Sequence, residues 1–266
     1  MVNFRKVNKK LENAKNLYLE GIRDGNAREA VTKYTGERYT QHSTGVRDGV
    51  EGFVEFFEPF IKRNPKRHIE IVRGWFDGQY VFIHAYQSLN DGEAKWVTTD
   101  FFDTDENDKI IEHWDVIAEY TDATPSGHTS VDGATEIIDL DQTEANKQLV
   151  RNLIGDGLMK GGNPANLSNY ISGEQYIQHN KEVPDGLEHF LKLANQPNPP
   201  LTYQEIVLCV GKGNFVATLS KANWNDGKIN QDYAQVDIFR IENGKVVEHW
   251  DNAEPVPEVN VNSGKF

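Results

Sequence analysis

The sequence predicts an α+β protein built from two copies of one domain, each a curved mixed or antiparallel sheet wrapped around about three N-terminal helices. Three observations lead to this prediction. The chain has 266 residues, more than a typical single domain. Two motifs recur in the same order in its two halves. In each half, segments with helical periodicity come first and strand-like segments follow.

The repeat is visible by comparing the chain with itself. Residues 39–53 read YTQHSTGVRDGVEGF and residues 176–190 read YIQHNKEVPDGLEHF, with eight of fifteen positions identical and no gap. Residues 100–115, DFFDTDENDKIIEHWD, correspond to residues 237–251, DIFRIENGKVVEHWD, with one residue fewer. Because the order is preserved, an internal duplication explains both matches.

The first segments of each copy are predicted to be helical. In the first copy, apolar residues recur at spacings of three and four, which indicates a helix with one buried stripe: Val7, Leu11, Ala14, Tyr18 and Ile22. Gly25 is expected to end this helix, a shorter helix is expected at 27–34, and residues 39–42 read as extended. A third helix is expected after Asp48, with Asp48 and Glu51 at the spacing of a capping box.

The rest of each copy is predicted to be strand. Residues 69–76, 80–89, 95–103 and 110–118 are rich in β-branched and aromatic residues. Turn signals separate them: Asn90-Asp91-Gly92 in the first copy, Asn225-Asp226-Gly227 and Asn243-Gly244 in the second. Asn and Gly tolerate the positive φ angles that tight hairpins need.

A polar segment rich in Thr, Ser, Gly and Pro separates the copies. It lacks apolar periodicity, so we interpret it as a linker. The expected organisation is a first domain at 1–122, a linker at 123–139, and a second domain with a C-terminal tail at 140–266.

Composition excludes several classes of partner. The net charge of −13, without a long basic run, disfavours binding to nucleic acid or to an anionic membrane surface. The first ten residues have no apolar run behind them, and no stretch is long and apolar enough to span a bilayer. Cys209 is the only cysteine, so no internal disulfide is possible. These features favour a cytoplasmic protein.

The motifs and their order resemble the SnoaL-like branch of the NTF2-like superfamily. The resemblance rests on the two helices, Tyr-Ile-Gln-His-Asn, the Asp-Gly helix, the long hairpins and the final Glu-His-Trp-Asp, and it covers both halves apart from the linker and about the last ten residues. It implies two NTF2-like (cystatin-like) cone domains, each with a pocket at its open end. The family includes polyketide cyclases and is related to ketosteroid isomerases, and many members have no known reaction.

Proton removal beside a carbonyl needs a base and a group that stabilises the enolate. By the resemblance, His42 and His179 fall at about the chain position of the catalytic aspartate of ketosteroid isomerases, between the second and third helices. A neutral imidazole could act as a base near pH 7. Equally, both could be buried histidines bonded to backbone.

The resemblance also points to Asp100 and Asp237, which match the strand aspartate of the cyclases. Strand alternation puts Asp100 on one face with Thr98 and Phe102. An acid among aromatic side chains should have a raised pKa, which suits proton transfer, although a buried structural acid is an alternative.

His84 is the fifth candidate catalytic residue, on the assumption that it pairs with Asp100. The second copy has Leu219 there, so the first pocket would be catalytic and the second degenerate; a core histidine would also explain the difference. On the last strand, His113 and Asp115 share one face and Trp114 takes the other. The expected pocket-lining residues are Tyr39, Phe82, Tyr86, Phe102, His113, Tyr176, Phe239 and His249.

The leading hypothesis is a cofactor-independent enzyme that performs aldol cyclisation or isomerisation on a small apolar carbonyl compound. The alternative is a non-catalytic module that binds a small ligand or another protein. No HExxH or CxxC spacing indicates a metal, so neither a metal nor a cofactor is expected. The two copies are also expected to pair as a dimer-like unit within the chain.

Overall fold

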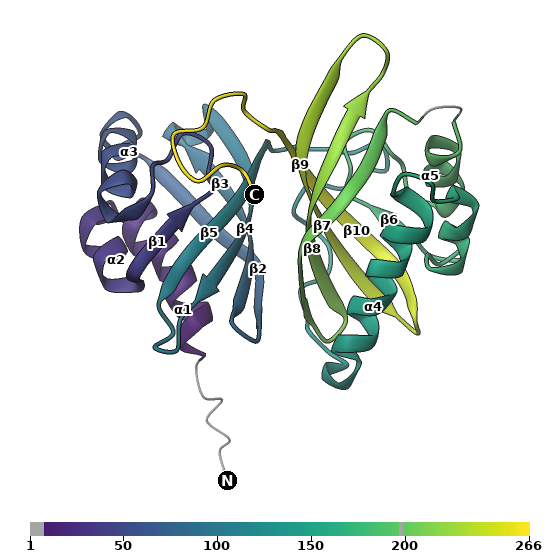
Figure 1. The fold of residues 1–266 in the computed structure, drawn as a ribbon, viewed down its shortest axis with the longest axis horizontal. Coiled ribbons are helices and arrows are strands. Elements are labelled where there is room, and N and C mark those ends of the chain that lie inside the picture. The colour runs from purple at the N-terminus through teal and green to yellow at the C-terminus, as the bar shows by residue number, and fades with distance from the viewer. Residues whose placement is uncertain (1–7, 197–198) are drawn as a thin grey trace. The chain divides into compact units, whose positions relative to one another are not determined.

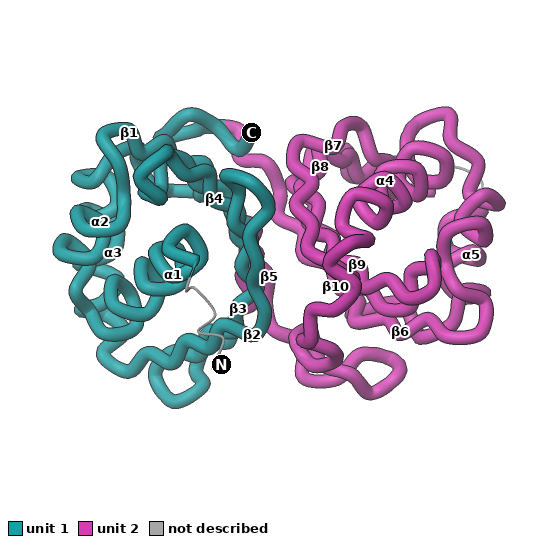
Figure 2. The backbone as a smooth tube through the Cα atoms, turned by 90° about the horizontal axis from the view of Figure 1, so that it is seen from below, with its two compact units in different colours: residues 1–95, 100–115, 259–266 teal, residues 96–99, 116–258 magenta. Residues whose placement is uncertain are grey.

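The structure is a computed structural model that describes residues 8–196 and 199–266. It confirms the predicted α+β class: two five-stranded sheets, each with its own helices (Figure 1). The chain divides into two compact units, which are coloured separately in Figure 2. Unit 1 comprises the chain up to Lys95, residues 100–115 and residues 259–266, and unit 2 comprises residues 96–99 and 116–258.

This division corrects the expected domain boundaries. The segment at 123–139 belongs to unit 2 and not to a linker between the units. The C-terminal residues 259–266 belong to unit 1, although they follow the last strand of the second copy. Neither segment has the apolar periodicity that would have marked it as part of a fold.

The first sheet has the strand order β1-β5-β4-β3-β2. β1 runs parallel to β5, and β2 pairs antiparallel with β3, so the sheet is mixed. A π-helical turn, Leu17–Arg23, continues the first helix. The other elements are α1 (Lys9–Asn16), α2 (Ala27–Tyr34), β1 (Thr35–Gln41), α3 (Gly49–Arg63), β2 (Arg67–Asp77), β3 (Tyr80–Leu89), β4 (Ala94–Thr104) and β5 (Ile110–Glu119).

The second sheet repeats this topology with the order β6-β10-β9-β8-β7, and β6 is parallel to β10. A π-helical turn, Ile154–Leu158, again continues the first helix, and a 3-10 helix, Pro164–Asn169, replaces the second. The remaining elements are α4 (Thr143–Leu153), β6 (Ile177–Gln178), α5 (Leu187–Ala194), β7 (Leu201–Lys212), β8 (Phe215–Asn225), β9 (Asn230–Glu242) and β10 (Lys245–Pro255).

Each unit has its own apolar core between its helices and one face of its sheet. In unit 1, Leu17 and Ile22 pack with Ile83 of β3 and Phe102 of β4, all of them buried. In unit 2 the core combines residues of α4 with residues of β7, β9 and β10. The sheet face against the helices is therefore the inner face, and side chains at alternate positions point to the outer face.

The predicted hairpin turns are confirmed. Asn90, Asp91 and Gly92 all have positive φ angles, as do Asn243 and Gly244. These conformations are costly for most side chains, which explains why Asn, Asp and Gly occupy them. Among the described residues, no helix has the length and apolar character needed to cross a membrane.

The expected capping box is wrong. The side chain of Asp48 caps no amide at the start of α3; instead its Oδ1 accepts a hydrogen bond from the backbone N–H of Gln41, at 2.7 Å. Glu51 forms an exposed ion pair with Arg28. In unit 2, Asp185 accepts from the backbone N–H of Gln178 in the same way, at 2.8 Å. The repeated Asp-Gly motif thus ties down the strand that carries a glutamine.

Candidate functional site

A mainly apolar cavity of about 160 Å³ lies in unit 2, at the inner face of its sheet. Its apolar lining includes Leu153, Tyr176, Phe190, Leu201, Trp224 and Phe239. Its polar lining is confined to a few side chains, among them Gln178, Asn180, Glu182, Tyr203, Asp237, His249 and Asp251. An apolar cavity with a few convergent polar groups is the usual form of a small-molecule site.

The centre of this polar group is a pair formed by Asp237 of β9 and His249 of β10. His249 Nε2 lies 2.9 Å from Asp237 Oδ1. Tyr203 of β7 donates its hydroxyl to the same carboxylate, 2.9 Å from Oδ2. The carboxyl and imidazole groups are both buried, so their interaction is weakly screened by solvent.

Gln178 determines which nitrogen of His249 carries a proton. The Oε1 atom of Gln178 accepts from the backbone N–H of Asn180, at 3.1 Å, and a backbone N–H can only donate. The same Oε1 lies 2.9 Å from His249 Nδ1, so Nδ1 must be the protonated nitrogen. Gln178 Nε2 donates to the Tyr176 hydroxyl, which fixes the amide from its other side.

The chain of bonds leaves Nε2 of His249 as the atom that can exchange a proton with Asp237. Burial lowers the pKa of His249, but its bond to Asp237 and the charges of Asp237 and Asp251 outweigh this effect, so the pKa is raised overall. The pair is therefore arranged to hold a proton inside an apolar cavity.

Unit 1 contains the same chain of side chains. His113 Nε2 lies 2.9 Å from Asp100 Oδ1, and His113 Nδ1 lies 2.8 Å from Gln41 Oε1. Gln41 Oε1 also accepts from the backbone N–H of Ser43, and Gln41 Nε2 donates to the Tyr39 hydroxyl. The tautomer argument therefore applies to His113 as well, with Nδ1 protonated.

The tyrosine that bonds the aspartate comes from a different element in each unit. In unit 1 it is Tyr18 of the π-helical turn, whose hydroxyl donates to Asp100 Oδ1 at 2.6 Å. In unit 2 it is Tyr203 of β7. Asp100 Oδ2 is buried and has no hydrogen-bond partner among the residues that the structure describes, whereas Tyr203 reaches both oxygens of Asp237.

A second acid lies beside each pair. Asp115 and Asp251 end the repeated Glu-His-Trp-Asp motif and are both buried. Asn180 donates to both oxygens of Asp251, at 3.0 and 2.8 Å, and Ser43 donates to Asp115 Oδ2 at 2.6 Å. Burial raises the pKa of Asp251, and it also raises the pKa of Asp100. Both acids therefore hold a proton more readily than an exposed carboxyl group does.

The structure does not bring His42 and His179 into these sites. His42 stacks on Trp114, with ring centroids 4.9 Å apart, and His179 stacks on Trp250 at 4.6 Å. These tryptophans point to the sheet face opposite His113 and His249, by the alternation along β5 and β10.

Both ring nitrogens of His42 and of His179 are also bonded. His42 Nε2 lies 2.9 Å from Glu112, and His179 Nε2 lies 3.0 Å from Glu248. Each Nδ1 donates to a backbone carbonyl, that of Gly264 for His42 and of Thr129 for His179. These bonds and stacks agree with the alternative that both are buried histidines bonded within the fold.

His84 is also placed away from Asp100, which corrects the expected pairing. On β3, Val81, Ile83 and Ala85 pack in the inner core, so the alternate residues Phe82, His84 and Tyr86 point to the outer face. Phe82 contacts Trp75 and Phe101 there.

His84 Nδ1 lies 2.7 Å from an Nη atom of Arg73. The expected placement of Phe82 and Tyr86 in the pocket is corrected as well, because both share the outer face of β3 with His84. The difference between His84 and Leu219 therefore does not distinguish the two Asp–His pairs.

The other expected residues lie on the inner face. Tyr176, Phe239 and His249 line the cavity of unit 2 together with Asp237. In unit 1, Phe102 stacks on His113, and Tyr39 bonds Gln41. Sequence reasoning missed the glutamines Gln41 and Gln178, although both stand in the repeated Tyr-x-Gln-His motif, which was the signal that could have found them. It also missed Tyr18 and Tyr203 as partners of the acids.

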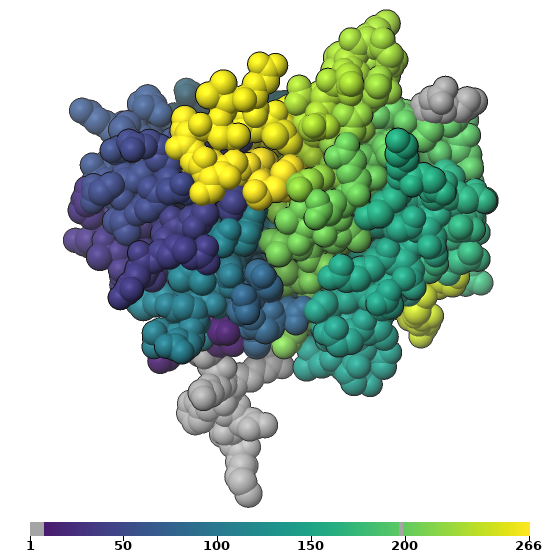
Figure 3. Space-filling model, viewed as in Figure 1, coloured from purple at the N-terminus to yellow at the C-terminus, as the bar shows by residue number. Residues whose placement is uncertain are grey.

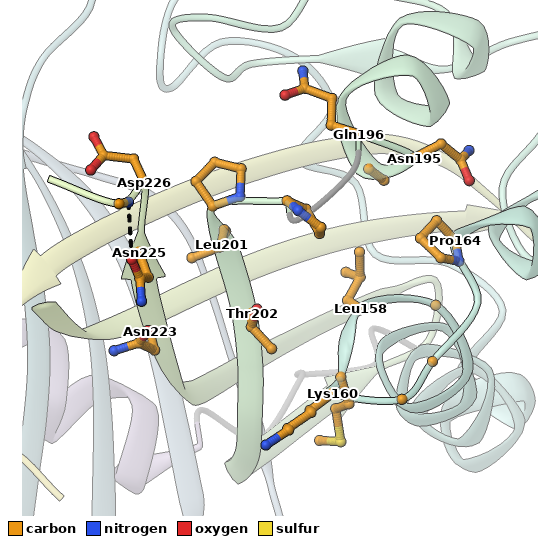
Figure 4. Close-up of a pocket in the computed structure, with 18 residues that line it drawn as sticks. Leu158, Lys160, Pro164, Asn195, Gln196, Leu201, Thr202, Asn223, Asn225 and Asp226 are labelled. Carbon is orange, nitrogen blue, oxygen red and sulfur yellow. Dashed lines mark hydrogen bonds between the residues drawn. The ribbon is translucent and has the colours of Figure 1, made fainter. Parts of the chain in front are cut away.

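The cavity of unit 2 adjoins a larger surface groove of about 1030 Å³, shown in Figure 4. The two share Leu158, Ala194, Pro199, Pro200 and Leu201 in their linings. The groove is more polar than the cavity: Lys160, Asn195, Gln196, Asn223 and Asn225 line it. The cavity and the groove are therefore neighbours with different linings, one mainly apolar and one polar.

Comparison with known proteins agrees with part of the expected resemblance. Residues 16–113 match the family model of the SnoaL-like domain. The match spans Tyr18, Gln41, Asp100 and His113, the polar chain of unit 1. No curated protein sequence matches the chain.

Solved structures similar to this chain include proteins of several described activities. A proposed polyketide cyclase from Bacillus cereus is 19% identical, with 41% of this chain and 74% of that chain covered and a TM-score of 0.37. A proposed SnoaL-like polyketide cyclase from Jannaschia is 17% identical, with coverages of 41% and 85% and a TM-score of 0.36. An epoxide hydrolase from M. tuberculosis is 11% identical, with coverages of 42% and 85% and a TM-score of 0.37.

Proposed function

We propose that the chain is a tandem pair of SnoaL-like domains, in which unit 2 transfers a proton beside the carbonyl group of a small, largely apolar compound without a cofactor. The observation that carries this proposal is the buried Asp237–His249 pair, which lines an apolar cavity. Isomerisation and aldol cyclisation both begin with such a proton transfer.

In the proposed mechanism Asp237 is the base. Its carboxylate takes the proton from the carbon next to the carbonyl group, and the C–H bonding pair moves into the enolate. His249 stabilises the carboxylate through Nε2 while its Nδ1–H stays bonded to Gln178. The proton is returned from Asp237 to a carbon of the enolate in an isomerisation.

Asp251 is the proposed stabiliser of the enolate oxygen. It lines the same cavity, and burial raises its pKa, so its carboxyl group can hold a proton and donate a hydrogen bond. Two acids with separated tasks in one apolar site are a known way to combine acid and base chemistry near pH 7.

The cavity limits the size of the reacting part. An apolar cavity of roughly 150 Å³ in another protein binds benzene. The cavity of about 160 Å³ in unit 2 therefore fits one ring or a short chain, and any larger substituent would have to lie in the polar groove.

Hydrogen exchange on a simple ketone tests the proposal without knowledge of the natural substrate. Cyclohexanone in D₂O should exchange its α-hydrogens faster in the presence of the protein, as followed by proton NMR. Asp237→Asn should lower this rate by about 10² to 10⁴, the usual contribution of a general base. Asp141→Asn, a change at an exposed acid, is the matched control and should leave the rate unchanged. Equal rates for the Asp237 variant and the parent protein would overturn the assignment.

A binding module is the alternative function, and one observation favours it. The oxygens of Asp237 already accept bonds from Tyr203, Gln235 and His249, so the carboxylate is well satisfied without a ligand. Such a module would bind the ketone, seen as shifts of resonances from residues that line the cavity, without any acceleration of exchange.

A further inference from the structure

The last residues of the chain are attached to unit 1 by a set of specific bonds. Asn262 Nδ2 donates to the carbonyl groups of Ser43 and Val46, both at 2.7 Å. Ser263 Oγ donates to Asp48 at 3.1 Å, and the carbonyl group of Gly264 accepts from His42 Nδ1 at 2.5 Å. In Figure 3 this C-terminal segment (yellow) lies against residues of unit 1 (purple and blue). We call residues 259–266 the tail.

Lys265 extends from the tail into the acidic site of unit 1. Its Nζ lies 3.3 Å from Asp115 Oδ1 and 3.4 Å from Thr44 Oγ1, and only 4% of the residue is exposed. Asp115 belongs to a buried group with Asp100 and His113, in which one polar atom of each residue lies within 4.8 Å of those of the other two. A lysine is rarely this buried unless its charge is paired.

Unit 2 has an equivalent strap that lacks the lysine. Residues 124–133 of the polar segment occupy the matching place: the carbonyl group of Thr129 accepts from His179, as that of Gly264 accepts from His42. The next residue, Ser130, bonds Thr121 instead of entering the site. Asp251, which corresponds to Asp115, is bonded by Asn180 and lines the cavity.

We propose that the tail is an intramolecular plug, in which the ammonium group of Lys265 occupies a cation-binding position at Asp115, and that unit 1 admits a ligand only when the tail is released. The ligand that unit 1 then accepts at this position is a small primary amine in its ammonium form. When Lys265 leaves, buried Asp115 loses its positive partner, and a buried carboxylate favours a replacement cation. This inference concerns unit 1 and does not depend on the activity proposed for unit 2.

Chemical labelling of lysines tests the plug directly. With an acetylating reagent and mass spectrometry, Lys265 should react at least about tenfold more slowly than exposed Lys62, because its amine is reached only when the tail opens. Asn262→Ala removes two bonds of the tail without touching the acidic site and should speed acetylation of Lys265. Asp115→Asn should do the same. Asp251→Asn, the corresponding change in unit 2, is the matched control and should not.

A rescue experiment tests the cation position. Lys265→Ala leaves a space shaped for an alkylammonium group, so n-butylamine at neutral pH should raise the melting temperature of this variant and leave that of the parent protein unchanged. Lys62→Ala controls for non-specific effects of the amine. Acetylation of Lys265 as fast as that of Lys62 in the parent protein would overturn the plug. Equal effects of n-butylamine on Lys265→Ala and Lys62→Ala would overturn the cation position.

Discussion

Replacement of Gln178 by leucine tests the row of hydrogen-bonded side chains in unit 2, in which Gln178 bonds His249 and His249 bonds Asp237. Leucine has a similar volume but cannot accept a hydrogen bond. Two donors would lose their acceptor: the buried His249 Nδ1–H and the part-buried backbone N–H of Asn180. Each unsatisfied buried group costs about 1–3 kcal/mol, so the variant should lose about 2–6 kcal/mol of unfolding free energy. That loss is large beside the roughly 5–15 kcal/mol of an ordinary domain.

Urea unfolding of the parent protein and the variant measures this loss. Gln148→Leu, on the exposed side of α4, is the matched control and should change the free energy by less than about 0.5 kcal/mol. Nitrogen NMR of the parent protein supplies the second readout, because it should show a proton on Nδ1 of His249. A bare Nδ1 in the parent protein would refute the reasoning, as would an effect of Gln178→Leu no larger than that of the control.

Two further changes probe other parts of unit 2. The pKa of Asp251 is raised by burial, so the folded state keeps its proton to higher pH than the unfolded state, and stability falls as pH rises from the ordinary value of about 4 through the folded value. Asp251→Asn removes this dependence. In urea unfolding, the free energy of unfolding of the variant should therefore rise relative to that of the parent protein between about pH 4 and pH 7. A difference between the two free energies that does not change with pH would contradict this prediction. Gly133→Ala should lower the free energy of unfolding by about 2 kcal/mol more than Gly127→Ala does in the same assay. Both residues have positive φ, but an added Cβ at Gly133 would lie 2.1 Å from Glu248, whereas one at Gly127 would have no atom within 4 Å. Equal losses would show that this segment is not docked.

Much of the fold could be predicted from the sequence because the signals were local. The spacing of apolar residues marked the first helix, and Asn-Gly and Asp-Gly marked the hairpins. The alternation along β4 and β5 placed Asp100 with Phe102, and His113 with Asp115, on shared faces. In the structure His113 does stack on Phe102 and bond Asp100.

The errors at the site arose because the alternation of residues along a strand does not show which face of the sheet is the inner one. Periodicity groups His84 with Phe82 and Tyr86, but it does not say which face of the sheet the helices cover. His42 follows Gln41 directly, so if one side chain points inward the other points outward. The prediction chose the histidine because imidazole is the commoner catalytic group. The glutamine was the inward residue.

The alignment of the two copies could not show that different tyrosines bond the aspartates of the two units. Tyr18 and Tyr203 do the same task from a helix and from a strand, so they occupy unrelated positions in the repeat. Only the three-dimensional arrangement shows that each hydroxyl reaches an aspartate. The polar segment and the tail were missed for a related reason, since they are held by backbone carbonyls and single side chains without an apolar pattern.

The position of the tail has a consequence for the order in which the protein matures during synthesis. Domains usually fold as they emerge from the ribosome, the N-terminal one first. Here, the carbonyl groups of Ser43 and Val46 and the imidazole of His42 receive their partners from Asn262 and Gly264, which are translated 216 to 222 residues later. These groups of the first half would therefore wait for their partners until residues 262–264 are made, and a nascent chain stalled before Asn262 would expose an unfinished edge to chaperones and proteases.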